Sequence, residues 1–263
     1  MHLSQERTKK GDRLLFRRTV VCEKSSLSPF SAALSLTRTA ALVLLVACAR
    51  TPPAPELRVV QRFLHGATES SPLIVALHGR GDSPDNFARL FEGFPMKVEV
   101  VLPQGLEPSG SGHQWFDMSG LALDDAELDR RIAAAEAKLW PALVKQAQGR
   151  KLIVVGFSQG AVMSYALAAR HPTEVIAAFP ISGWAPPLFT PQHNTPSSAC
   201  APIHALHGTA DDVVPVALAR QAERAFSRPG SSMDLREFEG ARHEVNAEMR
   251  AYLFARIVSV LPP

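Results

Sequence analysis

Residues 151–161, KLIVVGFSQGA, place one serine between two glycines at the end of an apolar run. The spacing G-x-S-x-G is short enough to arise by chance, so its surroundings decide its meaning. The run before Ser158 predicts a buried strand, and the alanine-rich stretch after it predicts a helix. Gly156 and Gly160 would allow the sharp turn that exposes a serine hydroxyl as a nucleophile. The alternative is that Ser158 only caps the N-terminus of that helix.

A serine nucleophile needs a base, and the base needs an acid that orients it. Downstream of Ser158, Asp211 and Asp212 fall in the turn HGTADDVVP, where an apolar run stops. His243 follows the last expected strand, so acid and base come after the serine in the order Ser, Asp, His. Three other downstream histidines are less well placed, since they lie within a strand, before the acid or in an irregular loop: His204, His207 and His193.

Attack on a carbonyl group also requires donors for the negative charge that develops on its oxygen. The backbone N–H of Gln159 follows the serine and lies at the start of the expected helix, where negative charge is favoured. The second donor is expected from the loop LHGRGDS, through the backbone N–H of Arg80. Gly79 and Gly81 would let this loop turn its amides inward. An ordinary glycine-rich turn is the alternative.

Strands and helices are expected to alternate along the chain. Apolar runs predict strands at 57–66, 72–79, 97–105, 151–157, 175–183, 203–208 and 233–240. Amphipathic stretches predict helices at 83–94, 124–148, 158–172, 215–226 and 246–260, and residues 106–120 are expected to be a loop. This order predicts an α/β fold with a mostly parallel sheet covered by helices on both faces. Ligands of such sheets bind beyond the carboxyl ends of the strands, where His78, Ser158, Ser182 and His207 lie.

Six segments resemble, in the same order, the phospholipase/carboxylesterase family of α/β-hydrolases, which includes the acyl-protein thioesterases: LHGRGD, LPQG, WFD, GFSQGA, HGTADDVVP and RHEV. The resemblance runs from about Pro72 to the C-terminus. It implies an α/β-hydrolase fold with Ser158 as nucleophile, Asp211 as acid and His243 as base. It also implies that Trp115, in the WFD segment, lies near the acyl pocket as a substrate-binding residue. No metal and no organic cofactor are implied.

The N-terminal part departs from the usual pattern of that family. A positive flank, a short apolar stretch and Cys48 resemble the lipobox of bacterial lipoprotein signals, which implies cleavage before Cys48 and a diacylglyceryl group on its thiol. We therefore expect a signal segment at 1–47, a proline-rich tether at 48–56 and a catalytic domain at 57–263. A signal of this length would be unusual, so translation is expected to start nearer Arg38.

These features predict an exported protein, either in the bacterial periplasm or attached to a membrane through the lipidated Cys48. The alternative for the apolar stretch is a buried helix that happens to end in cysteine.

The charge distribution also separates the N-terminal part from the rest. The chain has 263 residues with 28 Lys/Arg and 25 Asp/Glu, but residues 1–50 hold nine of the basic and three of the acidic residues. The remainder is mildly acidic and has no basic run, which argues against a nucleic-acid partner. Cys22, Cys48 and Cys200 show no metal-ligand spacing, and an odd number of cysteines does not suggest a disulfide framework.

Together the motifs predict a serine hydrolase that cleaves carboxylic esters, either small molecules or acyl esters, through an acyl-enzyme. A thioesterase, a feruloyl-type esterase or a polymer esterase would use the same three residues. A surface lipoprotein that keeps the hydrolase fold as a binding module is the alternative from a different class.

Overall fold

The computed structural model describes residues 57–119, 125–190, 200–226 and 232–261. The expected signal segment, the tether and the lipidation site Cys48 lie outside these residues. Among the helices within them, none is both long and apolar enough to cross a bilayer.

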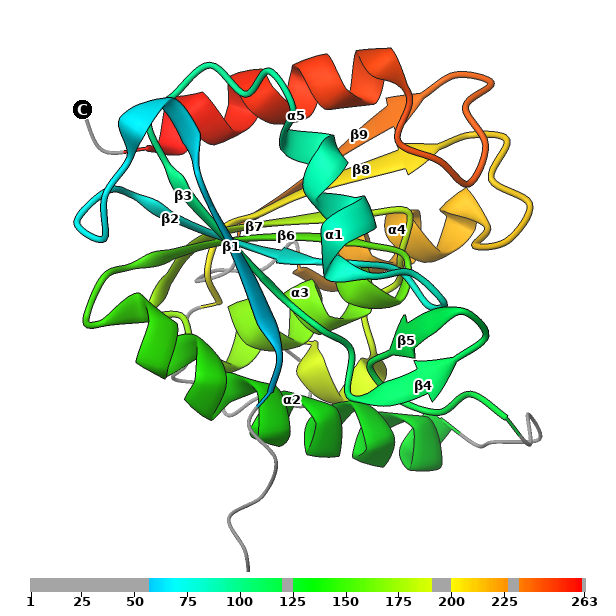
Figure 1. Ribbon diagram of the computed structural model, residues 1–263. Coiled ribbons are helices and arrows are strands. Elements are labelled where there is room, and N and C mark those ends of the chain that lie inside the picture. Colours follow the sequence, from blue (N-terminus) through cyan, green and yellow to red (C-terminus); the bar gives the residue numbers. More distant parts are fainter. Residues whose placement is uncertain (1–56, 120–124, 191–199, 227–231, 262–263) are drawn as a thin grey trace, which may run out of the picture. The chain divides into compact units, whose positions relative to one another are not determined.

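In the described part of the chain, seven strands form one sheet in the order β1-β3-β2-β6-β7-β8-β9 (Figure 1). Strand β1 at one edge runs antiparallel to β3, and the other neighbours pair in parallel. The predicted mostly parallel α/β sheet is therefore confirmed, and the carboxyl ends of its parallel strands meet at one edge. The strands are β1 Val59–Phe63, β2 Leu73–Leu77, β3 Glu99–Pro103, β6 Leu152–Phe157, β7 Val175–Ile181, β8 Ile203–Gly208 and β9 Met233–Phe238.

Within the described ranges, five α-helices cover the two faces of this sheet. Figure 1 shows α5 on one side of the sheet and α2 on the other. Helix α1 begins after Ser83, whose Oγ accepts a hydrogen bond from the Asn86 amide, and a turn of 3-10 helix at Ala88–Phe91 continues it. The described helices are α1 Pro84–Phe87, α2 Asp125–Ala147, α3 Gln159–Arg170, α4 Val216–Phe226 and α5 Ala247–Val260.

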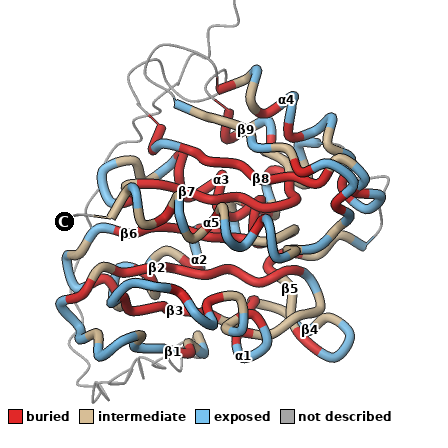
Figure 2. Tube along the Cα trace, turned by 90° about the horizontal axis from the view of Figure 1, so that it is seen from above, coloured by how far each residue is buried: buried red, intermediate tan, exposed pale blue. Residues whose placement is uncertain are grey.

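Side chains of the central strands alternate between two apolar cores, one on each face of the sheet. In β2, Val75 and Leu77 belong to the core under α2, α3 and α4, while Ile74 and Ala76 belong to the core under α1 and α5. All four are buried, because both faces of the strand are covered. Figure 2 shows this burial along the inner strands, whereas β1 at the edge is largely exposed. Burial on both faces explains why the strand sequences are continuously apolar rather than alternating.

The segment 106–120 is not the simple loop that we expected. It contains a hairpin of two short antiparallel strands, β4 Glu107–Ser109 and β5 Gly112–Gln114. Each strand has only three residues and includes glycine, proline or serine, so no hydrophobic alternation marks it. The hairpin is stabilised by a contact that is remote in sequence, since His113 also forms a β-bridge with Asp82.

Candidate active site

Ser158 lies on the turn between β6 and α3. Its φ is 54° and its ψ is −116°, a backbone conformation that residues other than glycine rarely adopt. Such strain costs about 1–3 kcal/mol and persists only where the surrounding packing maintains it. A Cβ at Gly156 would lie closer than 3.0 Å to the Gly160 carbonyl oxygen, and one at Gly160 would lie as close to the Leu77 carbonyl oxygen. Both glycines of the motif are therefore needed for β6 and α3 to pack at this turn.

The Ser158 side chain does not cap α3, although the residue occupies the capping position. Its hydroxyl is instead hydrogen bonded to Nε2 of His243 at 3.0 Å, and Nδ1 of His243 to Oδ2 of Asp211 at 2.8 Å. Because an ionised carboxylate only accepts, the imidazole proton lies on Nδ1, and Nε2 is free to accept from the serine hydroxyl. The structure thus brings together three residues that follow β6, β8 and β9, respectively.

Of the two neighbouring aspartates, Asp211 is the one that faces His243. Its Oδ1 accepts hydrogen bonds from the amides of Val213 at 3.0 Å and Val214 at 2.8 Å. Burial by itself would raise the pKa of Asp211, but the hydrogen bonds from Val214, His243 and Val213 outweigh it and hold the pKa below its ordinary value. Asp212 is exposed and forms a surface ion pair instead.

The three other histidines considered as a base have different surroundings. His207 is buried, and its Nε2 donates to the Val214 carbonyl at 2.8 Å. Burial lowers the pKa of His207, which keeps the ring neutral. His204 lies within β8 and is hydrogen bonded to Asp234 of the neighbouring strand β9. His193 lies outside the described residues.

The two amides expected to stabilise an oxyanion lie beyond the ends of neighbouring strands. The Arg80 amide follows β2, the Gln159 amide is the first of α3, and β2 pairs directly with β6. In the described residues, neither amide donates to another protein group. A Cβ at Gly79 would lie 3.2 Å from the Phe157 ring and 3.5 Å from the Ser158 Cβ, so the loop that carries Arg80 runs close beside the serine.

Trp115, which we expect near the acyl pocket, is a buried residue in the structure. Only 1% of its surface is exposed. Its indole Nε1 donates to the His78 carbonyl at 2.8 Å, and its backbone N–H donates to the Gln159 side chain at 2.7 Å. The WFD pattern indicates the neighbourhood of the site but not the direction of the ring, which depends on these tertiary hydrogen bonds.

A sequence profile of the phospholipase/carboxylesterase family matches residues 60–255. The chain belongs to this family. Acyl-protein thioesterase 1 of Yarrowia lipolytica is 26% identical over 181 residues, which are 62% of this chain and 77% of the relative. Esterase YpfH of Escherichia coli is 26% identical over 204 residues, which are 72% of this chain and 83% of that protein. Membership of the phospholipase/carboxylesterase family places the protein among the hydrolases of carboxylesterase and thioesterase type.

Solved structures show the same fold. Esterase PE8 has a TM-score of 0.69 at 22% identity and covers 78% of this chain and 100% of its own. Acyl-protein thioesterase 2 of Zea mays has a TM-score of 0.64 at 22% identity, with 78% of this chain and 99% of its own covered. The predicted α/β-hydrolase fold is therefore confirmed for this member of the phospholipase/carboxylesterase family.

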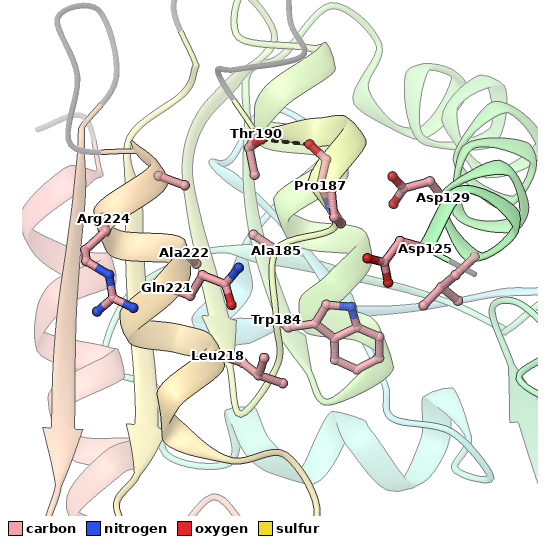
Figure 3. A pocket seen from close by; sticks show the side chains of 12 residues that line it. Asp125, Asp129, Trp184, Ala185, Pro187, Thr190, Leu218, Gln221, Ala222 and Arg224 are labelled. Carbon is pink, nitrogen blue, oxygen red and sulfur yellow. Dashed lines mark hydrogen bonds between the residues drawn. The ribbon is translucent and has the colours of Figure 1, made fainter. Parts of the chain in front are cut away.

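A cavity of about 520 Å³ lies between α2, the segment after β7 and α4 (Figure 3). Trp184 forms part of its wall, with carboxylates of α2 on one side and Leu218 of α4 on the other. Trp184 directly follows Gly183, where a Cβ would lie 3.0 Å from the Ser158 carbonyl oxygen. One residue of the cavity wall is thus the chain neighbour of a glycine that packs against the serine turn of this phospholipase/carboxylesterase family member, and sequence reasoning did not identify Trp184.

Two other side chains of reactive type in the described residues, a thiol and an imidazole, are buried in the protein. Cys200 is buried, and burial raises the pKa of its thiol to about 12, so it stays protonated near neutral pH. His78 was noted only as the end of an apolar run, but the structure buries it completely and uses both of its ring nitrogens in hydrogen bonds. In the same part of the chain, no group of three His, Cys, Asp or Glu side chains could hold a metal ion.

Proposed function

We propose that this member of the phospholipase/carboxylesterase family is a serine hydrolase that cleaves carboxylic esters through an acyl-enzyme at Ser158. The observation that carries the proposal is the hydrogen-bonded chain from Ser158 to His243 and on to Asp211. Such a chain is the arrangement that activates a serine hydroxyl, which is otherwise inert near neutral pH.

In the proposed first step, His243 Nε2 takes the hydroxyl proton while Ser158 Oγ attacks the ester carbonyl carbon. Asp211 keeps the imidazole in the tautomer that can accept this proton, and it stabilises the imidazolium that forms. The amides that hold Asp211 ionised also keep its second oxygen directed at His243, so orientation and charge come from the same carboxylate.

The tetrahedral intermediate carries its negative charge on the former carbonyl oxygen. In this proposal the Arg80 and Gln159 amides donate to it, and the support is that neither amide has a protein acceptor among the described residues. His243 then gives its proton to the leaving alcohol as the bond to the carbonyl carbon breaks. A water molecule activated by His243 attacks the acyl-enzyme, which releases the acid and restores Ser158.

The cavity beside Trp184 is our candidate for the acyl part of the substrate. Its wall combines the indole and apolar side chains such as Leu218 and Ala222 with a few polar groups, a composition common to small-molecule sites. Because Trp184 in its wall directly follows Gly183, which packs against Ser158, an acyl chain on Ser158 would extend toward this cavity.

Thioester hydrolysis is the second candidate, because two of the compared proteins are named acyl-protein thioesterases. The same serine, histidine and aspartate would act on a thioester, as they would on a feruloyl-type or polymer ester. A non-catalytic surface lipoprotein is the remaining alternative, and the complete set of three residues speaks against it.

We further propose that the protein is exported and attached to a bacterial membrane through a lipidated Cys48. The support is the lipobox-like sequence before Cys48 and the proline-rich stretch after it.

Replacing the proposed nucleophile tests the reaction. Ser158→Ala should abolish p-nitrophenyl ester hydrolysis, at least a 1,000-fold loss in kcat, because no acyl-enzyme can form. The wild-type protein should be labelled by a fluorophosphonate at Ser158 and nowhere else, as read by peptide mass spectrometry. Undiminished turnover in a folded Ser158→Ala variant would refute the assignment.

The neighbouring aspartates provide a matched pair of variants. Asp211→Asn should lower kcat by about 1,000-fold or more, since the imidazole loses the acceptor that sets its tautomer. Asp212→Asn should leave kcat within about 2-fold, since it removes only an exposed ion pair. Steady-state kinetics of both variants with the same ester measure the two values of kcat. Equal effects of the two substitutions would contradict the proposed role of Asp211.

Filling the cavity should change the preference for acyl chain length. Leu218→Trp places a larger ring in the cavity wall, so kcat/KM for octanoate esters should fall about 10-fold relative to acetate esters. Ala217→Trp, on the same helix but outside the cavity lining, is the control and should preserve the wild-type ratio. An unchanged ratio in Leu218→Trp would exclude this cavity as the acyl site.

The mature N-terminus tests the anchor. When the full chain is expressed in a bacterium, intact-mass analysis should find Cys48 as the first residue with a lipid attached, and the protein should enter the detergent phase of a Triton X-114 partition. Cys48→Ser should leave the protein unlipidated. Unmodified residues upstream of Cys48 on the mature protein would exclude the anchor.

A further inference from the structure

The hairpin β4–β5 and the two residues that follow Gln114 contact both loops that carry the proposed oxyanion donors. We propose that Trp115 and the side chain of Gln159 are positioning residues, which set the distance between the Arg80 and Gln159 amides. This inference rests on the proposed function, because it concerns how the same site holds its transition state.

The Gln159 side chain contributes the first half of this connection. Its Oε1 accepts from the Trp115 amide at 2.7 Å, and its Nε2 donates to the Phe116 carbonyl at 2.8 Å. Both hydrogen bonds are buried, and the whole residue is 2% exposed. One side-chain amide therefore pairs with the backbone on both sides of a single peptide link, which ties the first turn of α3 to the segment after β5.

The Trp115 indole contributes the second half. Its Nε1 donates to the carbonyl of His78, two residues before Arg80. The His78 ring is itself held at both nitrogens, because Nε2 accepts from the Gly105 amide at 3.0 Å and Nδ1 donates to the Gly79 carbonyl at 2.7 Å. The end of β2 is thereby fixed to the segment after β3 as well as to Trp115.

The hairpin itself completes the connection to the Arg80 loop. The Gly81 amide donates to the His113 carbonyl at 2.8 Å, and the His113 amide donates to the Asp82 carbonyl at 2.9 Å. A Cβ at Gly112 would lie closer than 3.0 Å to the Gly81 backbone, so the hairpin and the loop pack with their backbones in contact. The residues on both sides of Arg80 are thus hydrogen bonded to β5 or to the residue that follows it.

Both donors therefore depend on one short segment, His113–Phe116, although they come from loops that are remote in sequence. An oxyanion site is effective only when its donors are already directed at the position where charge develops. Loosening the segment would let the two amides move apart with no effect on Ser158, His243 or Asp211.

The test uses two variants of the full-length protein. Gln159→Leu removes the paired hydrogen bonds, and Trp115→Phe removes the indole donor together with part of the ring volume while it retains an aromatic ring. Each should lower kcat for a p-nitrophenyl ester about 10- to 100-fold with KM within about 3-fold, because the loss falls on the transition state. The inhibition constant of a trifluoromethyl ketone, whose adduct with serine carries an oxyanion, should rise by the same factor as kcat/KM falls.

Trp140→Phe is the matched control. Trp140 is a half-buried tryptophan that stacks on His171 at 3.4 Å, away from the hairpin, so its loss should change stability but not kcat. The double variant Gln159→Leu/Trp115→Phe should be less than multiplicative, since both substitutions release the same segment.

Two outcomes would overturn the inference. One is kcat within about 2-fold of wild type in folded Trp115→Phe and Gln159→Leu, as judged by circular dichroism. The other is a fall in kcat without any rise in the ketone inhibition constant. If Gln159→Leu does not fold, Trp115→Phe alone decides. Failure of the proposed function is recognised separately, because Ser158→Ala would then remain active.

Discussion

The tight packing of the turn around Ser158 is the constraint on which the rest of the site depends. The serine adopts φ of 54° because Gly160 lies against the end of β2 and Gly183 lies against the serine carbonyl. A side chain at either glycine would separate strands that must stay in register at this edge. Since β2, β6 and β7 are locked there, the loops after β8 and β9 can bring Asp211 and His243 within hydrogen-bond distance.

Around this turn, several buried polar side chains are held by hydrogen bonds with the backbone. Asp211 receives two amide hydrogen bonds in addition to the one from His243, so its charge is stable although the residue is only 6% exposed. The same solution holds His78, whose ring joins the ends of two strands. Polar side chains at the strand ends therefore connect separate segments through hydrogen bonds. This network restricts the movement of the proposed reacting groups.

Sequence reasoning predicted elements correctly where a hydrophobic pattern has a single structural explanation. Continuous apolar runs marked strands buried on both faces, and α2 was placed within one residue at each end. It was wrong about 106–120, because three-residue strands carry no periodicity and owe their pairing to Asp82 in a remote loop. It did not specify the direction of the Trp115 ring, since a buried tryptophan and one that contacts a substrate have the same sequence signature.

The sequence by itself determined the alternation of strands and helices, the order of Ser158, Asp211 and His243, and the glycines that permit the sharp turn, because these depend on local sterics and hydrophobic periodicity. The family resemblance implied Asp211 as the acid, but only the tertiary structure showed that Asp211 and not Asp212 is hydrogen bonded to His243, since the directions of two adjacent aspartate side chains are not encoded locally. The tertiary structure likewise decided that Trp115 points inward, because that direction depends on a hydrogen bond to the end of β2, which no local pattern encodes.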